Sequence, residues 1–69
     1  MQTKARIEAI VKTMPDLLRS DIVAADGLQT EAETLISEVA DTDPDYAFLA
    51  GATLDEIWMS WLVTSVGTL

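Results

Sequence analysis

Apolar residues recur along the first part of the chain at the three- and four-residue spacing of one helix face. The residues with this spacing are Ile7, Ile10, Val11 and Met14. They predict a helix over residues 3–13. Pro15 disfavours helical geometry in the residue before it but suits the start of a new helix. We therefore expect a break there, followed by a second helix that runs to about Asp26 and ends at Gly27.

Two capping boxes predict two further helix starts. In this motif, a Thr hydroxyl and the carboxylate of a Glu three residues later each accept an unpaired backbone N–H. Residues 30–33 and 53–56 both have the required sequence. The first box predicts a helix with an apolar stripe from Ala32 to Ala40. The second predicts a helix over residues 54–66.

A short helix is also expected between these two. Asp43 is suited to the N-cap and Pro44 to the first helical position, and Gly51 is suited to end the helix. No alternating strand pattern of useful length is present. The sequence thus predicts an all-α fold, a compact bundle of four to five short helices, in one domain over residues 1–69.

The helix expected over residues 54–66 is apolar on nearly all sides. One face holds Leu54, Ile57, Trp58 and Trp61, and a second holds Met59, Leu62, Val63 and Val66. Such a helix either fills the centre of a core or contacts another chain, and both interpretations stay open. The residues predicted for an oligomer or partner interface are Trp58, Met59, Trp61, Val63 and Val66.

The small size of the chain limits its stability. A domain this small buries only about 60% of the surface of its unfolded chain. The sequence of 69 residues has no cysteine and no histidine, so it lacks disulfides and the usual ligands of a structural zinc site. A homo-oligomer or a partner protein is therefore an expected source of further stability.

Charge is segregated along the chain. Four basic and two acidic residues lie in the first nineteen positions, a net charge of +2, whereas the other fifty hold ten acidic residues and no basic one, a net charge of −10. The acidic part should repel nucleic acid and attract a protein with a basic surface. The other explanation for these carboxylates is a solvated face that keeps the protein soluble or adapts it to high salt. We expect the basic residues to pair with acidic ones, within the chain or between subunits.

Residues suited to catalysis or cofactor binding are scarce. The chain has no His, no Cys, no glycine-rich phosphate loop and no nucleophile elbow. Residues 41–45 are similar to the first half of an EF-hand calcium loop, but Tyr46 and Ala52 stand where that loop needs Gly and Glu. We expect no enzymatic activity, no cofactor and no metal site.

Two functional hypotheses follow. The first is a non-enzymatic acidic binding protein, an inhibitor or DNA mimic that occupies the basic surface of a nucleic-acid-handling protein. Its docking charges would be Glu31, Glu38, Asp41, Asp43 and Asp45. In size and charge the chain is similar to small phage-encoded inhibitors, including some anti-restriction and anti-CRISPR proteins, although this similarity covers no motif. The second is a structural or adaptor subunit of an oligomeric assembly, such as a virion component, held by the apolar C-terminal helix.

The sequence also carries an expectation about location. Its N-terminus has no apolar stretch of the signal-peptide type. The most apolar segment, residues 57–66, is about half the length that a membrane-spanning helix needs. We expect no membrane association and a cytoplasmic location, in the cytoplasm of the host cell if the protein is viral.

Overall fold

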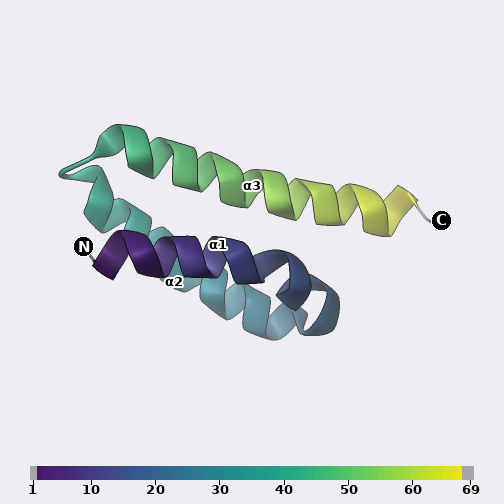
Figure 1. Cartoon of the computed structure of the whole chain (residues 1–69). Helices are drawn as coiled ribbons and strands as arrows, with labels where there is room; N and C mark the ends of the chain where they lie inside the picture. Colours follow the sequence, from purple (N-terminus) through teal and green to yellow (C-terminus); the bar gives the residue numbers. More distant parts are fainter. Residues whose placement is uncertain (1, 68–69) are drawn as a thin grey trace.

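Three long α-helices make up the part of the chain that the structure describes. The structure is a computed structural model that describes residues 2–67, with side chains to residue 65. Helix α1 spans Gln2–Ser20, α2 spans Ile22–Ala40 and α3 spans Pro44–Gly67. Helix α2 runs antiparallel to both α1 and α3, which share one direction (Figure 1). The all-α prediction is confirmed, whereas the prediction of four to five short helices is wrong.

Helix α1 continues through Pro15 instead of ending before it. Proline cannot donate a backbone hydrogen bond, and it disfavours the helical conformation of the preceding residue. That residue, Met14, is nevertheless fully buried in the helix, on the same face as Ile10 and Leu18. Burial of this face against the other helices outweighs the local preference of Pro15. The predicted inward face of the first helix is therefore confirmed, but its predicted end is wrong.

Helix α2 begins at its N-cap, Asp21, whose carboxylate accepts the N–H of Ala24 at 3.1 Å. The helix then passes through Gly27 without a positive φ. The predicted capping box at Thr30 does not form, because the Thr30 hydroxyl donates to the carbonyl of Asp26 at 3.2 Å, one helical turn earlier. The predicted end at Gly27 and the start near Thr30 are both wrong.

Helix α3 begins where the sequence predicts, at Pro44 after the N-cap Asp43. The Asp43 carboxylate accepts the N–H of Tyr46 at 3.1 Å, which confirms the capping role. The predicted end at Gly51 is wrong, and so is the second capping box. The Thr53 hydroxyl donates to the carbonyl of Leu49 at 2.8 Å within one uninterrupted helix.

The core lies where the three helices meet, and it is small. Its central cluster consists of Ile10, Met14, Leu18, Ala25, Ala32 and Leu54, and Ile7, Val39 and Ala47 are buried outside that cluster. Helix α2 contributes two alanines, whose small side chains permit close approach of the neighbouring helices. Ile22, the first residue of α2, lies outside this core and is 43% exposed.

The molecule is elongated, with principal extents of 43 × 19 × 15 Å. Helix α1 packs more extensively against α2 than against α3. Within residues 2–67, none of the helices combines the length and the apolar character needed to cross a membrane.

Candidate protein-binding surface

The two faces of α3 differ in their surroundings. The inner face contacts the core through Leu54, which is 1% exposed, and through the half-buried Ile57, Trp58 and Trp61. The two indole rings meet edge to face, with centroids 6.2 Å apart and planes at 79°. Trp58 Nε1 donates to Gln29 Oε1 at 2.8 Å, which ties α3 to α2. Both tryptophans of the predicted interface therefore belong to the inner face.

The outer face of α3 exposes large apolar side chains. Phe48 is 75% exposed, Met59 59% and Val63 65%. Leu49 and Leu62 lie exposed beside them. Met59 and Val63 belong to the predicted interface, whereas the side chain of Val66 lies outside the described residues. Sequence reasoning left Phe48 and Leu49 out, because the expected helix end at Gly51 separated them from Met59.

Exposed residues of the outer face follow the alternating spacing of a coiled-coil seam. Phe48, Ala52, Asp55, Met59 and Leu62 are separated by four, three, four and three residues, which is the spacing of heptad positions a and d. A flanking row at seven-residue intervals consists of Leu49, Glu56 and Val63. We call these eight residues the outer seam. All eight are exposed.

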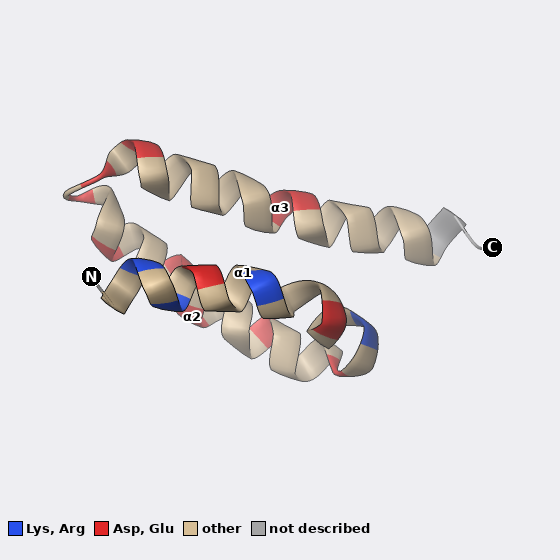
Figure 2. Cartoon of the chain, in the orientation of Figure 1, with Lys and Arg blue, Asp and Glu red and all other residues tan. Residues whose placement is uncertain are grey.

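The outer seam has an acidic centre between two apolar patches. Phe48 and Leu49 form one patch, and Met59, Leu62 and Val63 form the other. Asp55 and Glu56 lie between them and appear as the red band midway along α3 (Figure 2). The seven-residue spacing of these positions would have identified the seam from the sequence. It becomes visible only when a single helix is assumed to continue across Gly51.

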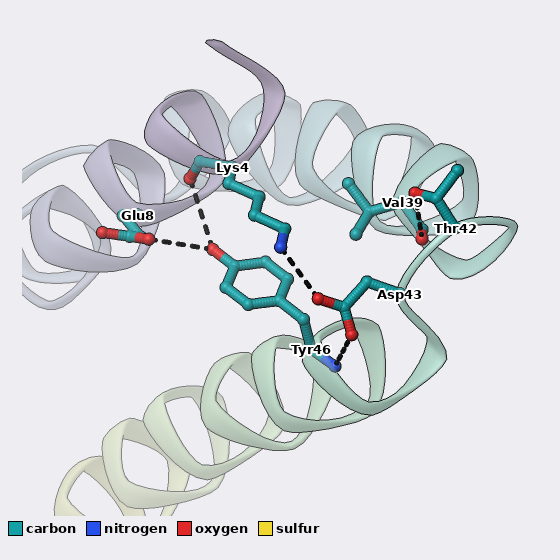
Figure 3. A network of polar contacts seen from close by, with 6 residues as sticks. All are labelled: Lys4, Glu8, Val39, Thr42, Asp43 and Tyr46. Atoms are coloured by element: carbon teal, nitrogen blue, oxygen red, sulfur yellow. Dashed lines mark hydrogen bonds and ion pairs between the residues drawn. The ribbon is translucent and has the colours of Figure 1, made fainter. Parts of the chain in front are cut away.

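Near the start of α3, Asp43 connects this helix to α1 (Figure 3). Lys4 Nζ lies 2.8 Å from Asp43 Oδ2 and 4.7 Å from the centroid of the Tyr46 ring. The Tyr46 hydroxyl donates to Glu8 Oε2 at 3.1 Å and lies 3.3 Å from the carbonyl oxygen of Lys4. The hydrogen bond from Lys4, followed by that from the Tyr46 N–H, lowers the pKa of the Asp43 carboxyl.

A second ion pair connects α1 to α2. Arg6 holds Glu31 with two hydrogen bonds, of 2.6 Å from Nε and 2.9 Å from Nη2. This bidentate hydrogen bonding lowers the pKa of the Glu31 carboxyl. The expectation that basic residues of the first helix pair with the acidic segment within the chain is confirmed for Lys4 and Arg6.

These pairs divide the predicted docking charges into two groups. Glu31 and Asp43 are neutralised within the chain. Glu38, Asp41 and Asp45 are exposed and make no ion pair among the described residues; they lie around the turn between α2 and α3. The structure thus brings four of the five predicted charges together at the end of the molecule where α2 meets α3, and three of these four make no ion pair among the described residues (Figure 2).

An open groove of about 470 Å³ separates the end of α1 from α3. Leu18, Ile57 and Trp61 form its apolar lining, with Arg19 and Glu56 among the polar residues. Arg19 pairs with Asp16 of its own helix at 2.7 Å. Over residues 2–67, no group of three or more acidic side chains is arranged to hold a metal ion.

Comparison with known proteins gives no relative: no family model matches the chain, and neither a curated protein nor a solved structure matches it significantly.

Proposed function

We propose that this chain is a non-enzymatic protein-binding protein and that it contacts its partner through the outer seam of α3. The observation that carries the proposal is the exposure of Phe48, Met59 and Val63, at 75%, 59% and 65%. Single exposed apolar residues are common on protein surfaces, but two patches of large apolar side chains along one face of a helix are characteristic of an interaction surface. The inner face already makes the core contacts of α3, so the fold does not require an apolar outer face.

Charge supports a basic partner. The seam lies within the segment that has ten acidic residues and no basic one. A basic partner surface would approach this segment faster and in a preferred orientation. The proposed location is the cytoplasm, that of the host cell if the protein is viral.

A second candidate function is inhibition by DNA mimicry at the end of the molecule where α2 meets α3. It is favoured by the three exposed carboxylates there, those of Glu38, Asp41 and Asp45. Because Glu31 and Asp43 are paired internally, these three would make the contact with a basic surface. A third candidate, a structural subunit of an oligomer, uses the outer seam to bind further copies of the same chain.

Site-specific photo-crosslinking in cells tests the proposed function. A photoreactive phenylalanine analogue at Met59 should give discrete adducts with a protein. The same analogue at Ser37, an exposed position of α2, is the matched control and should give none. Adducts from position 37 but not from position 59, or no adduct from either, would refute binding through the seam. If the analogue is placed at Asp41 and only this position gives adducts, the result would favour the DNA-mimic function instead.

A further inference from the structure

We propose that the occupant of the outer seam is an amphipathic helix of a partner protein, with Lys or Arg facing Asp55 and Glu56 and apolar residues on either side. This inference rests on the proposed function and specifies the class of partner. It is carried by the spacing, the exposure and the charge of the seam.

The spacing of the seam favours a helix over a strand or a loop. The side chains from Phe48 to Leu62 recur at alternating steps of three and four residues. Side chains with this spacing can interdigitate with those of a second helix, as in a coiled coil. From Phe48 to Val63 the seam extends about 22 Å at 1.5 Å per residue. This length requires about four turns of a partner helix. An extended strand repeats its side chains every two residues and has no matching period.

The charge at the centre of the seam disfavours a second copy of this chain. In a parallel pair in register, Asp55 would lie beside its own counterpart. In an antiparallel pair centred on the seam, Asp55 would again face the acidic centre of the other copy. Carboxylates that face each other in this way repel, so they disfavour association of two copies through the seam.

The basic residues of the chain offer little compensation for that repulsion. None lies in residues 20–69. In α1, Lys4, Arg6 and Arg19 already form ion pairs, and Lys12 is the remaining basic residue without one among the described residues. A different chain with basic residues at the centre of an apolar helix face matches the seam better.

Two designed peptides test the charge of the occupant. Each is a fluorescein-labelled amphipathic helix of three heptads, with Leu at a and d except at the centre. One peptide has Lys at the central d and adjoining e positions, and the other has Glu there. Fluorescence anisotropy should show binding of the Lys peptide at least about tenfold tighter at low salt, with a smaller difference at high salt.

A charge swap supplies the matched test on the protein. The double variant Asp55→Lys, Glu56→Lys should prefer the Glu peptide, reversing the order seen for the wild type. Asp26→Lys changes an exposed carboxylate of α2 and should leave the preference unchanged. Circular dichroism of each variant establishes that the helices are retained.

The outcomes separate this inference from the proposed function. Equal binding of both peptides at the seam would overturn the basic partner but leave α3 as a binding surface. A dimer that Met59→Glu dissociates, without peptide binding, would identify a second copy as the occupant. A monomer that binds neither peptide up to about 1 mM and gives no cross-link from position 59 would overturn both proposals.

Discussion

The inner and outer faces of α3 are both apolar, yet only the inner face is covered. Leu54 on the inner face is 1% exposed, whereas Leu62 on the outer face is 46% exposed. The difference shows that apolar composition alone does not define a core in this chain. Two neighbouring helices cover one side of α3, and the other side remains accessible to a partner. Substitutions on the two faces, and at the contacts that hold α3 in place, should therefore differ in their effects.

The largest effect is expected from matched Leu→Ala substitutions on the two faces. Leu54→Ala removes a buried side chain at the contact of three helices and should cost about 2–5 kcal/mol of unfolding free energy. Leu62→Ala should change it by less than about 0.5 kcal/mol, because this side chain is exposed on the outer face. Urea unfolding followed by circular dichroism measures both.

The cost of Leu54→Ala should approach the entire unfolding free energy of so small a domain. Leu54→Met conserves volume and keeps the comparison measurable, with an expected cost below about 1.5 kcal/mol. A cost of Leu62→Ala equal to that of Leu54→Ala would contradict the assignment of inner and outer faces.

The next largest effect concerns association rather than folding. Asp55→Leu makes the row of a and d positions apolar from Phe48 to Leu62 and reduces the repulsion between two copies, with Glu56 as the remaining acidic residue of the seam. The variant should therefore self-associate at least about tenfold more strongly than the wild type, about 1.4 kcal/mol. Size-exclusion chromatography with light scattering over a concentration series measures this change. Asp26→Leu, on α2, is the control that should leave the dissociation constant unchanged.

Much of the fold was accessible from periodicity, but the helix count was not. The inward face of α1 and the start of α3 at Pro44, after the N-cap Asp43, were predicted correctly, because each depends on a local pattern that the packing also favours. Pro15, Gly27 and Gly51 were predicted to interrupt helices that continue. A glycine inside a helix costs only about 1 kcal/mol, so burial of a continuous apolar stripe can outweigh it.

The candidate surface could be predicted only in part, for the same reason. Met59 and Val63 were identified from the apolar arc of the last helix, and both are exposed. Trp58 and Trp61 face inward, because aromatic enrichment does not distinguish a core from an interface. Phe48 joins the seam only because the helix continues through Gly51, and a single sequence does not reveal that continuity.

Removal of the Trp58 hydrogen bond should weaken attachment of the inner face. Trp58→Phe keeps an aromatic ring but deletes the Nε1 donor to Gln29, at a cost of about 1 kcal/mol. Gln29→Leu alone and the double variant complete a double-mutant cycle. Fully additive effects in thermal unfolding would mean that this contact contributes nothing to stability.

A smaller effect, in the stabilising direction, is expected at the glycines inside α2 and α3. Neither Gly27 nor Gly51 has a positive φ, and an added Cβ at either has no atom within 4 Å. Gly27→Ala and Gly51→Ala should each stabilise the protein by about 0.5–1 kcal/mol, because alanine favours the helix. Destabilisation by Gly51→Ala would indicate a helix end at that position and would divide the outer seam into two segments.

The smallest effect concerns the exposed ion pairs that attach α1 to the other two helices. Hydrogen bonding from Arg6 and Lys4 lowers the pKa of Glu31 and Asp43 below the usual values. Stability from these pairs is therefore fully present above the unfolded pKa values of about 4, and it is lost as the pH falls through the lower folded values.

The double variant Glu31→Gln, Asp43→Asn should melt no more than about 5 °C below the wild type at pH 7, because exposed pairs contribute little. This difference should shrink as the pH falls through the lowered folded pKa values, because the wild-type carboxylates are then protonated as well. Thermal unfolding of both proteins from pH 7 downwards measures it, and a difference that does not shrink with falling pH would show that the substitutions act through packing instead of charge.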